Sequence, residues 1–172
     1  MPLTLATRIG PDTLGKLEQA ARRRYAEARR LTADEPLGAI YLFGYTIEMR
    51  LKAAYYRVVG LGTAHHISAG APSPRKVAET KICALLLLKP NSPVGHNLYG
   101  WGKLLEQTRA TLPAPGPLPT PMLSDMYIHL QNASLCWTEV IRYRATPPYD
   151  EELQVVDAAA RWFRMNYRRL WS

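Results

Sequence analysis

The chain is poor in cysteine, phenylalanine and acidic residues. It has two cysteines and two phenylalanines in 172 residues, and 14 acidic residues stand against 22 lysines and arginines. Cys83 and Cys136 lie 53 positions apart in apolar surroundings, which excludes a CxxC zinc motif, and we expect two reduced core thiols. The net charge of +8 favours an acidic partner such as nucleic acid, a nucleotide or an anionic surface.

Long hydrophobic runs and the common catalytic motifs are also missing. The aliphatic run from Ile82 to Leu88 is too short to cross a bilayer, and residues 1–14 lack the basic start and apolar core of a signal peptide. Glycine-rich phosphate loops, GxSxG turns and HExxH helices do not occur. We therefore expect a cytoplasmic protein without membrane contact, metal or cofactor.

Glycine is absent after Gly116, whereas the 14 prolines are concentrated in a few segments. Every second residue from 113 to 121 is a proline, which predicts an extended linker over 112–121. We expect residues 1–172 to form a single domain, with 63–93 as an insertion made of loop and short helix.

Between the prolines, apolar residues recur three and four positions apart, as in helices. The stretches with this pattern are 12–35, 37–71, 94–112, 122–146 and 149–172. The helix near 36–59 is apolar on almost every side and is expected at the centre, and the first is expected to begin with Asp12 as N-cap. The sequence predicts an all-α, up-and-down bundle of four to five long helices.

Two charged residues interrupt the most apolar helix. Glu48 and Lys52 are four positions apart and therefore share a helix face. They form either an ion pair at the edge of the core or part of a site, because a buried carboxylate needs a cation. Arg142 and Arg144, expected at the end of the fourth helix, are the cations we predict to meet Glu48.

Short motifs along residues 36–165 resemble a known family. They are Gly44-Tyr45 with Glu48 and Leu51-Lys52-Ala53, then Gly95-His96-Asn97-Leu98, then Trp137 and Arg142-Tyr143. Together they resemble the HEPN (higher eukaryotes and prokaryotes nucleotide-binding) domain. The resemblance implies a helical bundle that dimerises, binds nucleotide or RNA, and acts in prokaryotic toxin–antitoxin, defence or regulatory systems.

HEPN members that cleave RNA have an arginine followed, after four to six residues, by a histidine. Here the arginine corresponds to Arg142 or Arg144, and the histidine position is occupied by Tyr149. A phenol with a pKa of about 10 is a poor base near neutral pH, where an imidazole with a pKa of about 6.5 can act. The resemblance therefore implies binding rather than cleavage.

The expected binding site combines these residues, with His96 as an accessory group of structural or catalytic role. Its members are Glu48, Lys52, Arg142, Tyr143, Arg144 and Tyr149. Arginines would neutralise phosphate and tyrosines would stack on bases, although Tyr149 could instead pack against the break between two helices. Two alternatives stay open: a metal-independent endoribonuclease with His96 as base, and a bundle that binds only protein, such as an antitoxin or a nucleotidyltransferase.

Arginines also form a stripe on the first and last helices. They are Arg22, Arg23, Arg24, Arg29 and Arg30, and Arg161, Arg164, Arg168 and Arg169. If the two helices are neighbours, the stripes join into a surface for phosphates; otherwise they are solvated faces. Of the tryptophans beside the second stripe, we expect Trp162 or Trp171 to remain available to a partner.

Overall fold

A computed structural model describes residues 12–172 and contains six α-helices in that range. The helices are α2 (Leu14–Leu31), α3 (Pro36–Val58), α4 (Pro74–Leu85), α5 (Leu98–Thr111), α6 (Thr120–Cys136) and α7 (Asp150–Asn166), with 3-10 turns η1 (Glu139–Tyr143) and η2 (Arg168–Leu170). Within 12–172 there is no strand, only a bridge between Thr13 and His66. The all-α prediction is confirmed for this part of the chain.

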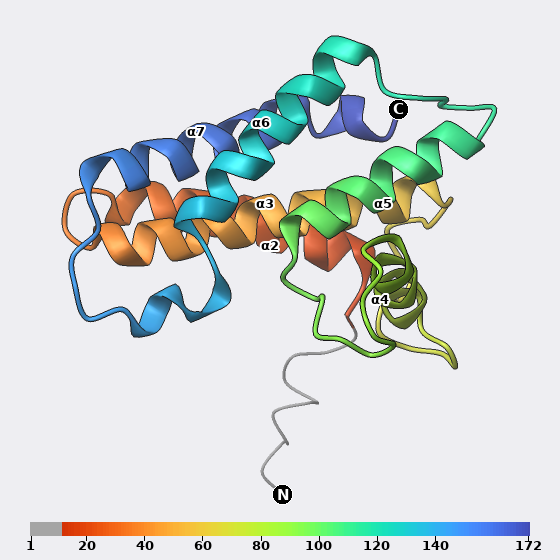
Figure 1. The fold of residues 1–172 in the computed structure, drawn as a ribbon, viewed down its shortest axis with the longest axis horizontal. Helices are drawn as coiled ribbons and strands as arrows, with labels where there is room; N and C mark the ends of the chain where they lie inside the picture. The colour runs from red at the N-terminus through yellow and green to blue at the C-terminus, as the bar shows by residue number, and fades with distance from the viewer. Residues whose placement is uncertain (1–11) are drawn as a thin grey trace, which may run out of the picture.

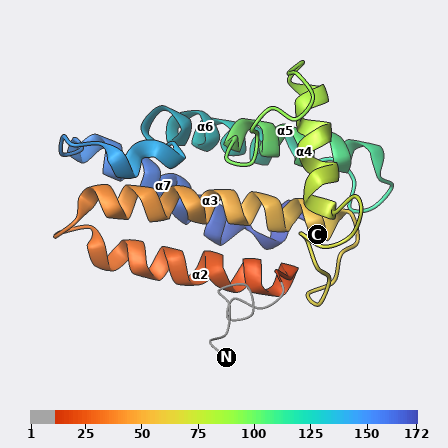
Figure 2. The ribbon, with the colours of Figure 1, turned by 90° about the horizontal axis from the view of Figure 1, so that it is seen from below.

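Residues 12–172 contain six helices rather than the predicted four to five, and the additional one, α4, lies in the 63–93 insertion, where a short helix was expected. The Ser73 side chain accepts a hydrogen bond from the backbone N–H of Lys76 and caps α4, and Pro74 occupies its first turn. Ala78 and Ile82 are fully buried. Figure 2 shows α4 lying crosswise at one end of the bundle, where it packs against α5.

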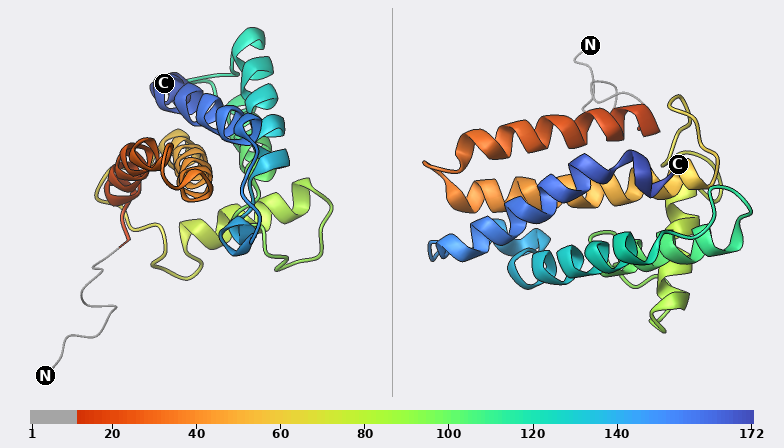
Figure 3. Two further views of the ribbon diagram at one scale, coloured as in Figure 1. Left: turned by 90° about the vertical axis from the view of Figure 1, so that its left-hand side faces the viewer. Right: turned by 90° about the horizontal axis from the view of Figure 1, so that it is seen from above.

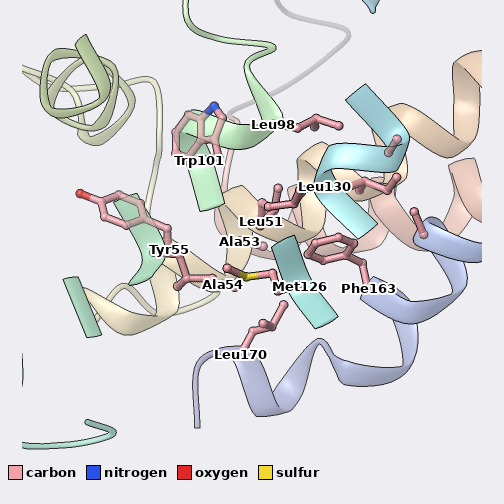
Figure 4. Close-up of a cluster of buried hydrophobic side chains, with 14 of the residues drawn as sticks. Leu51, Ala53, Ala54, Tyr55, Leu98, Trp101, Met126, Leu130, Phe163 and Leu170 are labelled. Carbon is pink, nitrogen blue, oxygen red and sulfur yellow. The ribbon is translucent and has the colours of Figure 1, made fainter. Parts of the chain in front are cut away.

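The apolar helix α3 lies at the centre, as expected. α2, α5 and α7 all pack against it (Figure 1), because it presents apolar side chains on every face. The core continues through Leu51 of α3, Met126 and Leu130 of α6 and Phe163 of α7 (Figure 4). α3 ends at Val58, and Gly60, two residues later, has a φ of +86°, a conformation that suits glycine.

The start of α2 differs from the prediction by one residue. Thr13, not Asp12, is the N-cap, and its hydroxyl accepts a hydrogen bond from the backbone N–H of Lys16. Asp12 instead accepts a hydrogen bond from the Ser68 hydroxyl at 2.7 Å. Thus Asp12 ties the insertion to the N-terminal side of α2.

The helix expected over 122–146 ends early, at Cys136. Trp137 adopts an extended backbone, and its indole N–H donates to the carbonyl of Tyr41 at 3.1 Å. The ring covers Gly44, where an added Cβ would lie 2.1 Å from the indole nitrogen. Packing of this large side chain on α3 therefore competes with continuation of α6, and Arg142 and Arg144 lie outside a long helix.

The linker between α5 and α6 is shorter than the predicted 112–121, because α6 already begins at Thr120. Arg109 of α5 is buried beneath this linker and donates to the carbonyls of Gly116 at 2.7 Å and Leu170 at 2.8 Å. One guanidinium thus holds both the linker and the C-terminal turn. None of the helices in 12–172 combines the length and apolar character needed to cross a membrane.

Candidate functional site

Glu48 is buried on α3 and has two basic partners. Its side chain is only 4% exposed, and its two carboxylate oxygens lie 2.5 Å from Lys52 Nζ and 2.8 Å from His96 Nδ1. Lys52 lies over the Trp101 ring, 5.1 Å from its centroid. The charge of Glu48 is therefore compensated by its own helix and by the segment that precedes α5.

The prediction that Arg142 and Arg144 neutralise Glu48 was wrong. Arg142 donates to the hydroxyl of Tyr41 at 3.1 Å, whereas a single nitrogen of Arg144, Nη1, donates to both carboxylate oxygens of Glu152 at 2.8 and 3.0 Å. The early end of α6 causes this difference, since both arginines lie on η1 and the loop after it, beside the first turns of α3 and α7. The expected single cleft is thus divided.

A row of aromatic rings connects the two halves of the expected site. The Tyr45 ring contacts the rings of Tyr41 and His96, with centroid distances of 4.8 and 5.6 Å. Burial, followed by the neighbouring Tyr41, raises the pKa of Tyr45, so its phenol stays neutral and contributes no charge. The row therefore runs from Arg142 through the rings of Tyr41, Tyr45 and His96 to Glu48.

His96 combines an oriented ring with access to solvent. Its side chain is 39% exposed, and the hydrogen bond with Glu48 raises the pKa of the imidazole. The ring does not cap α5; Asn97 does so, through its side-chain oxygen and the backbone N–H of Gly100. A buried carboxylate that holds one imidazole nitrogen while the ring reaches solvent is an arrangement that can move a proton.

A groove of about 460 Å³ lies where the first turns of α3 face the loop after η1. Tyr41, Arg142, Arg144, Pro147 and Pro148 are among the residues that line it. Tyr143 and Tyr149 are each 72% exposed, so the alternative in which Tyr149 packs against the helix break was wrong. Both phenols are free to contact a ligand.

The two arginine stripes meet along what we call the α2–α7 seam. The contacts Arg29–Asp157, Arg164–Tyr25 and Tyr167–Glu18 show that the helices run antiparallel. Figure 3 shows α7 lying over α3 and beside α2. The carboxylate of Asp157 accepts hydrogen bonds from Arg29 at 3.0 Å and Arg161 at 2.9 Å.

Sequence reasoning missed the arginines of α3 that complete this seam. Arg50 and Arg57 lie seven positions apart and so share a helix face, whereas Glu48 and Lys52 lie on another. Arg57 forms a bidentate pair with Glu18 of α2, with both distances 2.9 Å. The seven-residue spacing of two basic residues in an apolar helix was the signal that could have revealed them.

Two expected features of single residues can be placed as well. His129 is half-buried and its ring packs against that of Trp162, with ring centroids 5.3 Å apart and the planes tilted by 36°. Cys83 is buried and Cys136 half-buried, and both are free thiols. Residues 12–172 hold no group of three side chains suited to bind a metal ion.

Comparisons of the chain with family models, curated proteins and solved structures found no match.

Proposed function

We propose that this is a HEPN-like RNA- or nucleotide-binding protein of a prokaryotic defence, toxin–antitoxin or regulatory system, which binds RNA without cleaving it. The observation that carries the proposal is the α2–α7 seam, where arginines from three helices meet. Arg22, Arg57 and Arg164 represent α2, α3 and α7 in one pocket. Such a concentration of guanidinium groups favours phosphate as the partner.

The charge of the seam is weakly compensated. The arginines of the seam face three carboxylates, Glu18, Glu27 and Asp157, and each carboxylate is already hydrogen-bonded by arginine. The arginines in excess are therefore available to a polyanion. Phosphate contacts of this kind make affinity depend steeply on salt.

Base contacts belong, in this proposal, to the exposed tyrosines of the segment that borders the groove at the other end of α3. Arg142 lies over the Tyr143 ring at 4.7 Å from its centroid, and Tyr149 is exposed nearby in sequence. Exposed aromatic rings bind unpaired bases by stacking, at about 1–3 kcal/mol per base. Glu48 and Lys52 support this groove through the aromatic row rather than contacting the ligand.

The test measures fluorescence anisotropy of a labelled single-stranded RNA at several salt concentrations. Changing Arg161 and Arg164 to glutamine should weaken binding and reduce the slope of log K against log salt by about 0.7 for each phosphate that the variant no longer neutralises. Arg75→Gln on α4 is the matched control, because Arg75 is also exposed but lies away from the seam. Binding that is undetectable at low salt would contradict the proposal.

One observation favours a second function, that of a metal-independent endoribonuclease. Glu48 and His96 form an oriented carboxylate–imidazole pair with the ring partly open to solvent. Incubation with tRNA in EDTA tests it: this function requires cleavage that His96→Ala abolishes. Intact RNA after prolonged incubation would leave binding as the function.

A homodimer and an antitoxin or nucleotidyltransferase partner are further parts of the proposal, which follow from the HEPN resemblance. Light scattering after gel filtration tests the first, with a mass near twice 19.4 kDa expected. A monomer at micromolar concentration would contradict it.

A further inference from the structure

The α2–α7 seam contains a pocket of about 630 Å³, which we call the arginine pocket. It lies where the N-terminal half of α2 is beside the C-terminal end of α7. Its charged lining residues are Arg22, Arg50, Arg57, Arg164, Arg168 and Glu18. One carboxylate thus faces five guanidinium groups. Because Glu18 is engaged by Arg57 and by the Tyr167 hydroxyl at 2.5 Å, it leaves the other four uncompensated.

Arg50 is the unusual member of this set. It is only 5% exposed, yet it takes part in none of the ion pairs of residues 12–172, and its Nε has no hydrogen-bond acceptor. Its guanidinium lies over the Tyr167 ring, 4.6 Å from the centroid. A buried cation without an anionic partner is costly, which points to a partner that comes from outside the chain.

The pocket contains a second buried donor without an acceptor and a second guanidinium group that lies over an aromatic ring. The Nε1 of Trp171 is a second buried donor without an acceptor among the described residues. Arg57 lies over the Trp171 ring at 5.6 Å from its centroid and is held by Glu18. Stacking and pairing therefore fix the guanidinium planes before any ligand arrives, which reduces the entropy lost on binding.

We propose that the arginine pocket binds a phosphate dianion, either free or as the terminal phosphomonoester of a nucleotide or an RNA. Arg50 would bind it at the bottom of the pocket, and Arg22, Arg164 and Arg168 would bind it nearer the surface. A terminal group is favoured because only a chain end can reach the buried Arg50. A monoester carries nearly two charges at neutral pH and offers three acceptor oxygens, which suits several uncompensated donors.

The inference rests on the proposed function, since the pocket is part of the seam to which we assign RNA. Calorimetry with inorganic phosphate, AMP and adenosine separates the phosphate from the base. We expect binding of phosphate and AMP and none of adenosine, with acetate failing to compete. Acetate competing as well as phosphate would overturn the assignment to a dianion.

Substitutions test which arginines of the pocket bind the phosphate. Arg50→Met keeps the packing of the buried stem and should weaken AMP binding by about tenfold or more, the loss expected for a charged hydrogen bond. The exposed Arg168→Gln should also weaken it, which keeps the test valid if Arg50→Met fails to fold. Arg75→Gln is the matched control, because Arg75 of α4 is exposed and lies outside both the pocket and the seam. Equal affinity in all three variants would overturn the proposal.

One RNA sequence with either a 5′-phosphate or a 5′-hydroxyl separates this inference from the proposed function. Preferential binding of the phosphorylated RNA, together with a shift of the Trp171 indole N–H resonance, supports both. Equal binding of the two RNAs, with no effect of AMP, would overturn the pocket and leave the seam. Binding of AMP with no binding of either RNA would support the pocket and overturn the assignment of RNA to the seam.

Discussion

The carboxylate of Glu48 lies within an apolar helix, where a charge is stable only when it is paired. Lys52 supplies one partner from the same helix, and His96 supplies the second from a position 48 residues later. The local pair could be predicted from helix periodicity, whereas the histidine could not, because its approach depends on how α5 docks on α3. This arrangement makes His96 a reporter of the site.

The pKa values of His96 and His129 should be shifted in opposite directions. The hydrogen bond with Glu48 raises the pKa of His96, whereas burial lowers the pKa of His129. NMR titration should therefore place His96 above and His129 below about 6.5, and Glu48→Gln should lower only the pKa of His96. The stabilisation from protonated His96 is complete below about pH 6.5 and is lost as the pH rises through its raised value.

A titration in which Glu48→Gln leaves the pKa of His96 unchanged would contradict the hydrogen bond between Glu48 and His96. Because 39% of the His96 side chain is exposed, solvent screens the pair and its effect on the free energy of unfolding should be small.

Gly44 is required by the packing of Trp137. An added Cβ would lie 2.1 to 2.2 Å from three atoms of the indole, so Gly44→Ala should destabilise the fold by about 1–3 kcal/mol through overpacking. Gly38→Ala in the same helix is the control, because its Cβ would meet nothing closer than 3.5 Å and alanine favours a helix. Urea denaturation measures both variants, and equal stability would contradict the assigned packing.

Among the helices, α6 shows how contacts between elements override a local pattern. Apolar spacing continues past Cys136 through Val140 and Ile141, and it predicts one helix over 122–146. Burying the Trp137 ring on α3 requires an extended backbone at that residue, so the chain continues as η1. The position of Arg142 and Arg144 follows from this single change of direction.

The junction of α5 with the C-terminus depends on Arg109. Arg109 is 3% exposed and its guanidinium donates to carbonyls of the linker and of η2, so Arg109→Met should leave buried acceptors unpaired. We expect a decrease of at least about 2 kcal/mol in the free energy of unfolding. Arg24→Gln, which removes an exposed pair with Glu27, should cost less than about 1 kcal/mol. Similar decreases in chemical denaturation would contradict this role.

For the bundle as a unit, the hydrogen bonds from Arg57 and Tyr167 to Glu18, which we call the Glu18 network, join α2, α3 and the end of α7. Burial tends to raise the pKa of Glu18, but hydrogen bonds from Arg57 and Tyr167 outweigh it, and the net pKa lies below 4.5. The stabilisation is therefore complete above pH 4.5 and is lost as the pH falls through the lower folded value.

Glu18→Gln should accordingly destabilise the protein at pH 7 by about 3 kcal/mol, since it leaves Arg57 without its anion. The destabilisation should be smaller at pH 3, because below about pH 4.5 the carboxylate takes up a proton when the chain unfolds and stabilises the folded state less. Guanidinium denaturation at both values measures the difference. Equal destabilisation at the two pH values would contradict the network.

The helical class, the central place of α3 and the excess of positive charge follow from the sequence, because each depends on residue types and on spacing along one segment. Which charged side chains come into contact depends instead on how segments remote in sequence pack against one another. Packing of Trp137 on Gly44 separates Arg142 from Glu48, and the antiparallel docking of α7 beside α2 brings Arg164 and Arg22 to the buried Arg50. Steric overlap and ion pairing between remote side chains arise only when the helices pack together. The different partners of the two ends of α3 are therefore decided by the tertiary structure.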